Sequence, residues 1–317
     1  MVSTASGWAS NTARKAEPRM KILLLGKNGQ VGWELQRSLV PLGEVLALDR
    51  HSTQYCGDLT KPEQLVQTVL AYKPDFIVNA AAYTAVDKAD SEPELARCIN
   101  TDAPAALAKA AAQIGAWLVH YSTDYVFDGS GSHARQEGEG TGPVNVYGQT
   151  KLAGEKAIVA SGCKYLIFRT SWVYAARGDN FAKTMLRLAQ ERDKLTVIND
   201  QHGAPTGADL IADVTAHAMR RMMNTQNITL GGVYHLVASG ETTWHGYASY
   251  VIEQAKRIRP DLAWKVADVA PVSTSAFPTP AARPLNSRLC TMKLEQAFDL
   301  VLLPWQLGVE RMLAEIL

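Results

Sequence analysis

The sequence lacks the features that stabilise disulfide-linked or zinc-dependent proteins. Its four cysteines are scattered, with no CxxC pair and no histidine at a spacing suited to zinc: Cys56, Cys98, Cys163 and Cys290. Residues 1–19 contain no apolar core of the kind that a secretory signal needs, and no apolar run approaches the ~20 residues that cross a bilayer. We therefore expect a cytoplasmic protein with reduced thiols and no membrane association. Residues 1–19 are expected to be a disordered leader or an added extension, with Met20 as the functional start.

An excess of charge of either sign is also missing. The chain has 32 basic and 31 acidic residues and a formal net charge of +1. It therefore offers no electrostatic footprint for nucleic acid, and an anionic partner would have to be bound locally. At 317 residues and 47% hydrophobic content, the chain can bury a full core and is expected to divide into a larger and a smaller lobe.

What the sequence does contain, up to about residue 170, is an alternation of short apolar runs with helical patterns. This order is typical of a parallel sheet with helices on both faces. The expected strands are Ile22–Leu25, Val45–Leu48, Phe76–Asn79, Leu118–Ser122 and Tyr165–Arg169. The expected helices are Val31–Leu39, Pro62–Tyr72, Glu94–Ile114 and Val146–Ala160. The predicted fold class is therefore α/β, with a Rossmann-type doubly wound parallel sheet, and its ligands should bind at the carboxyl ends of the strands.

The pattern loosens after Thr170, and residues 171–317 are expected to form mainly a smaller α/β lobe that binds substrate. Some of its segments could return to the dinucleotide-binding domain, which is expected over 20–170. Further helices are expected at Asn180–Gln190, Asp209–Met222, Trp244–Ile258 and Thr291–Phe298. The proline-rich stretch Pro271–Pro284 is expected to be an extended loop.

A glycine cluster directly follows the first strand. Gly26, Gly29 and Gly32 have the spacing GxxGxxG and precede a helix that opens near Gln30. Free N–H groups and the helix dipole at that position can bind a pyrophosphate. A plain strand-to-helix turn is the alternative, because a glycine cluster alone is weak evidence. Asp49 ends the second strand, where a carboxylate can accept hydrogen bonds from the adenine ribose.

The choice between NADH and NADPH stays open. Asp49 favours NADH, whereas Arg50 and His51 follow it directly and could receive the extra phosphate of NADPH. Asp58 and Leu59 come next at an expected strand end, where they could border the adenine or be ordinary surface and core residues.

Tyr147 and Lys151 lie one turn apart in the predicted helix Val146–Ala160, so that the phenol and the ammonium share a face. A nearby ammonium favours phenolate, and a phenol with an ordinary pKa of ~10 could then exchange protons nearer neutrality. Thr123 follows the preceding strand with a hydroxyl that could bond the same substrate oxygen. A proton donor beside a nucleotide site is what hydride transfer to a carbonyl requires. The chain is therefore predicted to be a nicotinamide-dependent reductase, although an amphipathic tyrosine at a helix start is the simpler alternative.

Six segments together resemble the extended short-chain dehydrogenase/reductase family, whose triad is Ser or Thr, Tyr and Lys. The segments are 26–35, 79–89, 121–127, 145–155, 169–174 and 199–207. The resemblance runs from about Met20 to the C-terminus. It is densest to the branch that reduces the C4 keto group of dTDP-4-dehydro-β-L-rhamnose to dTDP-L-rhamnose, the last step of dTDP-rhamnose synthesis. It implies NADPH or NADH as cofactor and a dTDP-sugar as substrate.

The resemblance also implies a role for each matching position. The implied catalytic residues are Thr123, Tyr147 and Lys151. The implied cofactor-binding residues, from the pyrophosphate through the adenosine to the nicotinamide, are Gly26, Gly29, Gln30, Val31, Gly32, Asp49, Asp58, Leu59, Ala82, Tyr83, Thr84, Tyr121, Tyr147 and Lys151. The implied substrate-binding residues are Thr123, Asp124 and Trp172.

Assembly is the last feature that the resemblance implies. In this family a glutamate at the position of Glu34 can join carboxylates such as Asp209 and Asp213 to bind Mg²⁺ between the subunits of a homodimer. Two carboxylates one helical turn apart are otherwise a solvated face. The product is expected to enter a bacterial surface polysaccharide, such as the O-antigen of lipopolysaccharide. Two alternatives stay open: another nucleotide-sugar 4-ketoreductase or epimerase, and a non-catalytic regulatory subunit of the same fold.

Overall fold

A computed structural model describes residues 19–225 and 228–317 of the chain. The expected leader therefore lies outside the described residues, apart from Arg19. The centre of the molecule is a six-stranded sheet in the order β10-β5-β4-β3-β1-β2, and its neighbouring strands all pair in parallel. Its strands are β1 (Met20–Leu25), β2 (Gly43–Leu48), β3 (Phe76–Asn79), β4 (Trp117–Thr123), β5 (Lys164–Thr170) and β10 (Gly232–His235). The predicted α/β class with a doubly wound parallel sheet is confirmed.

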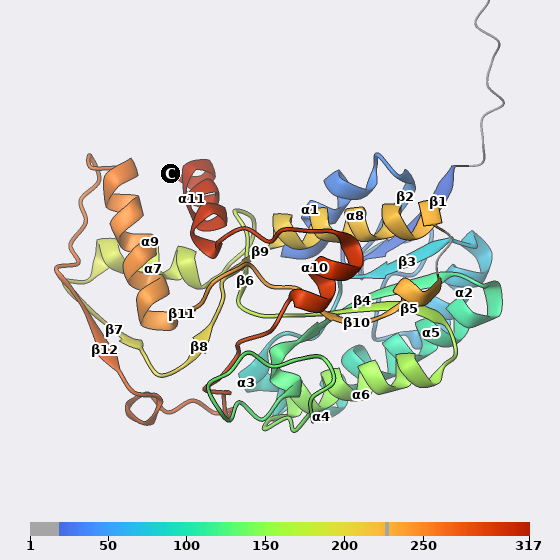
Figure 1. Cartoon of the computed structure of the whole chain (residues 1–317), viewed down its shortest axis with the longest axis horizontal. Coiled ribbons are helices and arrows are strands. Elements are labelled where there is room, and N and C mark those ends of the chain that lie inside the picture. Colours follow the sequence, from blue (N-terminus) through green and yellow to red (C-terminus); the bar gives the residue numbers. More distant parts are fainter. Residues whose placement is uncertain (1–18, 226–227) are drawn as a thin grey trace, which may run out of the picture.

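Helices cover both faces of this sheet, as Figure 1 shows. One face carries α1 (Gln30–Leu39) and α8 (Ala208–Thr225), and the other carries α2 (Pro62–Tyr72), α5 (Ala103–Ile114) and α6 (Val146–Ala160). Successive strand residues point to opposite faces, so Ile22 and Leu24 pack in the core under α1 while Leu23 and Leu25 pack under α2 and α5. A strand buried on both faces is continuously apolar, which is why these strands could be recognised in the sequence.

The single helix expected over Glu94–Ile114 is wrong in detail. The structure has α4 (Pro93–Arg97), a π-helical turn η1 (Cys98–Asp102) and then α5. Pro104 lies in the first turn of α5, and a proline ring inside a continuous helix would clash with the preceding turn and remove a hydrogen bond. A π-turn accommodates that defect. Its residue Asn100 becomes important for the site described below.

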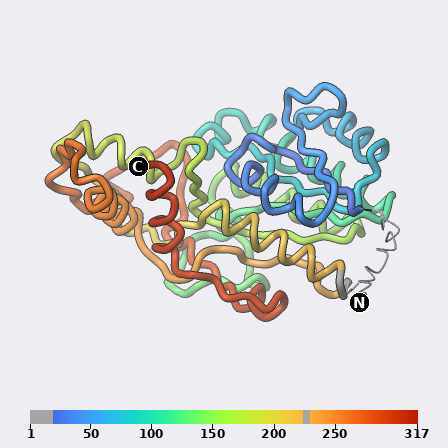
Figure 2. Tube along the Cα trace, turned by 90° about the horizontal axis from the view of Figure 1, so that it is seen from above, coloured from blue at the N-terminus to red at the C-terminus, as the bar shows by residue number. Residues whose placement is uncertain are grey.

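A second unit packs beside the sheet and contains three longer helices: α7 (Phe181–Glu191), α9 (Trp244–Ile258) and α11 (Trp305–Ile316). Its two-stranded pairings are β7 (Lys194–Ile198) with β12 (Asp268–Val272), β8 (His202–Gly203) with β11 (Thr242–Thr243), and β6 (Val173–Tyr174) with β9 (Thr206–Gly207). Figure 2 shows this unit and the C-terminus at one end of the molecule, and the β1–α2 region at the other. The short helices are α3 (Val86–Ala89) and α10 (Met292–Phe298), and the 3-10 turns are η2 (Asp124–Val126), η3 (Ile228–Leu230) and η4 (Thr274–Ala276).

The second unit also contains an element that the sequence analysis missed. In α11, Trp305, Val309, Met312 and Leu313 are buried, at the spacing of one apolar helical stripe. Trp305 packs edge-on against Tyr247 of α9, with ring centroids 5.8 Å apart. The segment Pro271–Pro284 begins in β12 and contains η4, but is otherwise without regular structure.

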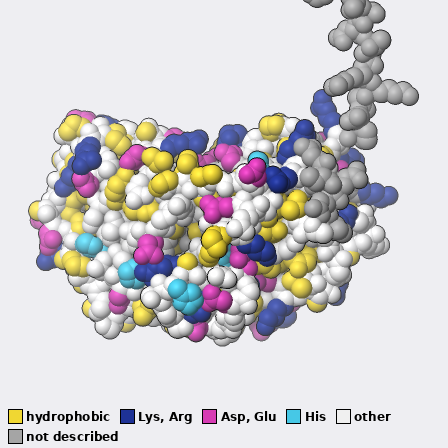
Figure 3. Space-filling model, viewed as in Figure 1, with side chains coloured by type: hydrophobic (Ala, Val, Ile, Leu, Met, Phe, Trp, Pro, Cys, Tyr) yellow, Lys and Arg dark blue, Asp and Glu magenta, His cyan; other side chains and the backbone are white. Residues whose placement is uncertain are grey.

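The surface offers few clues to function. Figure 3 shows basic and acidic side chains interspersed over the face in view, in keeping with the net charge of +1. Within residues 19–225 and 228–317, no helix has the length and apolar character to cross a bilayer.

Candidate active site

A cavity of about 720 Å³ opens at the carboxyl ends of β1, β3, β4 and β5 and reaches the start of α9. It brings together most residues that the sequence analysis selected. These are Gly26, Gly29, Gln30, Val31, Ala82, Thr84, Tyr121, Thr123, Asp124, Tyr147, Lys151 and Trp172. The other expected cofactor residues are not in its lining: Gly32, Asp49, Asp58, Leu59 and Tyr83.

The glycine loop has a backbone that larger residues would disrupt. Gly26 has φ +88°, and a Cβ there would lie 2.8 Å from the backbone nitrogen of Ala81. A Cβ on Gly32 would lie 2.0 Å from the carbonyl oxygen of Gly26. Gly29 caps α1 without a side-chain hydrogen bond, so the N–H groups at the start of α1 are open to an anion in the cavity. This is the geometry of a pyrophosphate cradle.

Asp49 lies just beyond β2 as expected, and its carboxylate is already engaged. Oδ1 accepts hydrogen bonds from the backbone nitrogen of His51 at 2.9 Å and from the Ser52 hydroxyl at 3.1 Å. Oδ2 accepts from Asn28 at 2.5 Å. Burial opposes the charge, but the hydrogen bonds from His51 and Ser52, together with the nearby Lys27 ammonium, outweigh it and lower the pKa of Asp49. The group is therefore a fixed anion.

Asn100 of the π-turn holds the chain segment that follows β3. Its side-chain oxygen accepts from the backbone nitrogen of Tyr83 at 2.9 Å, and its Nδ2 donates to the carbonyl of Tyr83 at 3.0 Å. This pair of bonds fixes the backbone through which Ala82 and Thr84 line the cavity. The phenol of Tyr83 instead donates to Glu92 at 2.6 Å. The sequence analysis missed Asn100, because nothing local links it to Tyr83.

Lys151 has only 2% of its surface exposed. Its ammonium donates to the carbonyl oxygen of Tyr121 at 2.5 Å, and its Nζ lies 3.4 Å from Nε2 of His120. Burial lowers the pKa of Lys151 to about 8, although the carboxylate of Glu155 opposes that shift. The phenol of Tyr121 lies on the other face of the sheet, 2.8 Å from the hydroxyl of Thr215. Tyr121 therefore contributes its backbone, and not its phenol, to the environment of Lys151.

Tyr147 lies in the first turn of α6. Asn145 caps that helix by accepting from the backbone nitrogen of Gly148 at 2.8 Å, and the Tyr147 ring packs edge-on against Tyr125 at 5.6 Å. Burial raises the pKa of Tyr147 to about 12; the Thr123 hydroxyl lowers it, and the carboxylate of Asp124 raises it further. The expected net lowering of this pKa by Lys151 is therefore wrong for this structure, because burial dominates and the lysine is bonded to Tyr121.

Three buried side chains of the cavity lining carry polar atoms without a hydrogen-bond partner in the described part of the chain. They are Ser122 (Oγ), Asp124 (Oδ2) and Thr170 (Oγ1). The other oxygen of Asp124 accepts from Thr123 at 3.0 Å. Burial raises the pKa of Asp124 to about 6, and the nearby Ser287 hydroxyl partly offsets that rise. The Oδ2 atom of Asp124 nevertheless has no hydrogen-bond partner among the described residues. An unpartnered buried polar group costs about 1–3 kcal/mol, which a polar ligand would offset.

Two tryptophans form one wall of the cavity. The rings of Trp172 and Trp244 stack with centroids 3.8 Å apart and an interplanar angle of 17°. Trp172 has φ +48°, a conformation that is strained for a bulky residue and that directs its ring toward α9. The Trp244 indole donates to Gln201 at 3.1 Å. Sequence reasoning found Trp172 but missed Trp244, which appeared only as the first residue of a helix.

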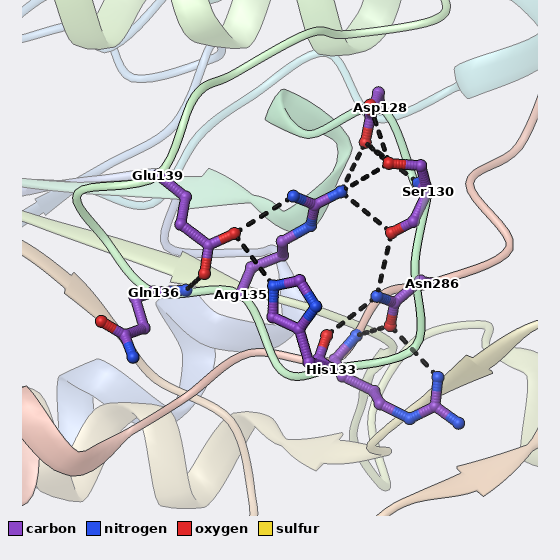
Figure 4. A network of polar contacts seen from close by, with 8 residues as sticks. Asp128, Ser130, His133, Arg135, Gln136, Glu139 and Asn286 are labelled. Atoms are coloured by element: carbon purple, nitrogen blue, oxygen red, sulfur yellow. Dashed lines mark hydrogen bonds and ion pairs between the residues drawn. The ribbon is translucent and has the colours of Figure 1, made fainter.

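The loop after β4 is organised by the polar network in Figure 4, which sequence reasoning also missed. The guanidinium of Arg135 donates to Asp128 at 2.7 Å and to Glu139 at 3.1 Å. Asn286 donates to the carbonyl oxygens of Ser130 at 3.3 Å and His133 at 2.9 Å. The network thus joins this loop to the segment that contains Asn286 and Ser287, and Ser287 lies close to Asp124.

The carboxylates expected to bind a metal are paired with arginines. Glu34 lies 3.4 Å and Asp213 lies 2.9 Å from the guanidinium of Arg37, and Asp209 lies 3.2 Å from that of Arg311. Among the described residues, no three His, Cys, Asp or Glu side chains gather closely enough to hold a metal ion. These carboxylates do not fit a metal site within one chain.

Comparison with known proteins gives a consistent result. The family model described as the RmlD substrate binding domain matches residues 20–317. The chain is 60% identical to a dTDP-4-dehydrorhamnose reductase of Escherichia coli K12 over 94% of this chain and 98% of that protein. It is 47% identical to one from Burkholderia thailandensis over 92% and 97%. The fold is similar to that of a dTDP-4-dehydrorhamnose reductase from Bacillus anthracis in complex with NADP, with TM-score 0.82, 34% identity, and coverage of 94% of this chain and 99% of that one.

Proposed function

This chain belongs to the RmlD substrate-binding-domain family, and we propose that it reduces the C4 keto group of dTDP-4-dehydro-β-L-rhamnose to give dTDP-L-rhamnose, with NADPH or NADH as hydride donor. One observation carries the proposal. Thr123, Tyr147 and Lys151 line a single cavity beside the glycine loop, in a chain 60% identical to an E. coli dTDP-4-dehydrorhamnose reductase.

A dinucleotide fits the residues at the β1 end of the cavity, and when bound it supplies a hydride. The start of α1, with Gly29, Gln30 and Val31 in the lining, would hold the pyrophosphate through backbone N–H groups. The fixed carboxylate of Asp49 would accept hydrogen bonds from the adenine ribose. Support comes from the NADP complex of the B. anthracis protein. Asp58 and Leu59 would border the adenosine, and Tyr83 would lie at the nicotinamide end.

Tyr147 is the proton donor in this proposal. A pKa of about 12 keeps its phenol protonated at neutral pH, which suits a group that must give a proton to the C4 oxygen as negative charge develops there. The Thr123 hydroxyl, which acts on the phenol and donates to Asp124 in this structure, would turn its proton from Asp124 to the same oxygen. The ammonium of Lys151 would bind the nicotinamide ribose, while its bond to the Tyr121 carbonyl holds it in place.

The sugar nucleotide would occupy the other end of the cavity, against the unit built from α7, α9 and α11. The free oxygens of Ser122, Asp124 and Thr170 would bond hydroxyls of the sugar. The indole of Trp172, stacked on Trp244, would offer an apolar face to a flat ring. We accordingly assign residues 20–170 mainly to the dinucleotide and 171–317 mainly to the substrate.

Assembly and cellular role complete the proposal. We infer a cytoplasmic homodimer whose product supplies a surface polysaccharide such as an O-antigen. The proposal includes no magnesium site within one chain, because Glu34, Asp209 and Asp213 are each paired with an arginine.

The test is a coupled assay with the purified chain. The dTDP-4-keto sugar is generated in place, and the oxidation of NADPH and of NADH is followed separately. We expect turnover with identification of dTDP-L-rhamnose as the product. A product with a different sugar configuration would reassign the substrate, and cofactor binding without turnover would favour a regulatory subunit.

A further inference from the structure

A histidine that the sequence analysis did not select lies next to Lys151. His120 of β4 is 1% exposed, and its Nε2 lies 3.4 Å from the Nζ of Lys151. On its other side, its Nδ1 lies 3.2 Å from the Nδ2 of Asn79, its register partner on β3. The ring therefore connects Asn79 to the lysine of the proposed triad, below the floor of the cavity.

The hydrogen bonds around Asn79 determine which ring nitrogen carries the proton. The backbone nitrogen of Ala81 donates to Oδ1 of Asn79 at 3.3 Å, which orients the amide so that its Nδ2 faces His120. An amide nitrogen only donates, so Nδ1 of His120 must accept. Burial, with a smaller contribution from Lys151, holds the pKa of His120 well below 6.5, so the ring is neutral. Its single proton is therefore on Nε2 and points at Lys151.

We propose that His120 is a positioning residue for Lys151. The Nε2–H of His120 disfavours the ammonium form of Lys151. It also leaves the hydrogens of that ammonium to point toward the carbonyl of Tyr121 and the cavity. An ammonium has no lone pair and cannot accept from Nε2–H, whereas the neutral amine can. His120 thus sets how readily Lys151 loses its charge. The inference rests on the proposed function, in which the charged lysine binds the nicotinamide ribose.

Few other charges act on Lys151. Glu155 on the same helix stabilises the ammonium, but its carboxylate is held by Arg169 of β5 at 2.7 Å. Asp124 of η2 acts on Tyr147 and Tyr125. Charged residues on other elements packed against α6 are engaged in ion pairs of their own. Asp87 pairs with Arg283, and Arg97 pairs with both Glu94 and Asp102. Burial opposes the charge of Lys151, and by our proposal the Nε2–H of His120, 3.4 Å from the Nζ, opposes it as well.

The first test reads the tautomer directly and does not depend on activity. The chain contains 7 histidines, and ¹⁵N spectra of histidine-labelled protein, with and without the substitution His120→Gln, identify the signals of this ring. We expect a protonated Nε2 and a bare Nδ1 throughout the neutral range. A proton on Nδ1, or a ring that becomes charged near neutrality, would overturn the proposal.

The second test measures the basic limb of the pH profile of kcat/KM. In His120→Gln the side-chain amide lies near the position of Nε2 and can turn its oxygen toward the ammonium of Lys151, which stabilises the charged form. The basic limb, expected near the pKa of Lys151 of about 8, should therefore move upward by about one pH unit. The matched control is His235→Gln, a buried strand histidine on β10, which should leave the limb in place. An unmoved limb in His120→Gln would contradict the proposal, whatever its effect on stability.

These outcomes separate the inference from the proposed function. A wild-type chain without turnover would refute the proposed function, while the ¹⁵N spectra would still decide the state of His120. If His120→Gln does not fold, the spectra of the wild type, assigned by other histidine substitutions, decide the proposal. Turnover with an unshifted limb would refute the role of His120 alone.

Discussion

The indole of Trp172 stacks on that of Trp244 with ring centroids 3.8 Å apart, and this pair joins the end of β5 to the start of α9. One residue therefore belongs to the chain that leaves the central sheet, and the other to the second unit. Because both rings line the cavity, a flat group bound there meets a surface that depends on the two parts being packed together.

Replacing Trp172 by alanine should weaken sugar-nucleotide binding more than it slows the chemical step. Loss of an aromatic face costs about 1–3 kcal/mol, so we expect KM for the sugar nucleotide to rise about tenfold or more, with a smaller change in KM for NADPH. Steady-state kinetics of Trp172→Ala measure both. The control is Trp264→Phe, whose indole donates to the carbonyl of Arg259 away from the cavity. Equal increases in both KM values would argue against a substrate role.

Asp124 should make the folded state less stable as the pH rises. Its pKa is raised on folding from 3.8 to about 6, so in this window the folded state binds more protons than the unfolded state, and stability falls as pH increases. Asp124→Asn removes that loss and should be more stable than the wild type at pH 7 by about 3 kcal/mol, with weaker substrate binding. Urea unfolding of both proteins at about pH 4 and pH 7 tests this. The same difference at both pH values would show that Asp124 does not titrate as described.

Asp49 should favour NADH over NADPH. Its carboxylate is a fixed anion held by Asn28, His51 and Ser52, and it would repel an added phosphate. For Asp49→Ala we expect KM for NADH to rise about tenfold, from loss of a charged hydrogen bond, and KM for NADPH to change little or fall. The control Glu63→Ala removes an exposed carboxylate from the start of α2. Equal changes in KM for the two cofactors would show that the adenine ribose does not bind at Asp49.

Removal of divalent metal should have no effect. The carboxylates of Glu34, Asp209 and Asp213 lie against Arg37 and Arg311, which supply the positive charge that a metal would otherwise provide. We expect the same turnover and the same sedimentation coefficient with and without a chelator. A dimer that dissociates in chelator and reforms with Mg²⁺ would contradict this and restore the metal-bridged interface.

Much of the fold follows from local sequence pattern. The bounds of β3, α2, α6 and α9 are those expected, because β3 is an apolar run, a proline opens α2, and Asn145 and Thr243 stand at the N-caps of α6 and α9. Pro104, in the first turn of α5, is a sequence signal of the break before that helix. The period of Trp305, Val309, Met312 and Leu313 could likewise have revealed α11.

The parts that escaped prediction depend on contacts between distant segments. Asn100 with Tyr83, Asn286 with Ser130, and Trp244 with Trp172 are brought together only by the fold. The expected acidification of Tyr147 was wrong because burial raises its pKa more than its partners lower it, and burial is not visible in the spacing of Tyr147 and Lys151. Candidate site residues can thus be selected from the sequence, whereas the pKa values of their side chains require the structure.

The most direct test of the account is the turnover of Tyr147→Phe with the dTDP-4-keto sugar. Removing the hydroxyl eliminates the proposed proton transfer without touching the glycine loop, so kcat should fall by about 100-fold or more while the dissociation constant of NADPH stays within about twofold. Tyr125→Phe, which removes the hydroxyl from the adjacent ring, should keep turnover within about threefold of the wild type. Near-normal turnover in Tyr147→Phe would contradict the assignment of this phenol as the proton donor.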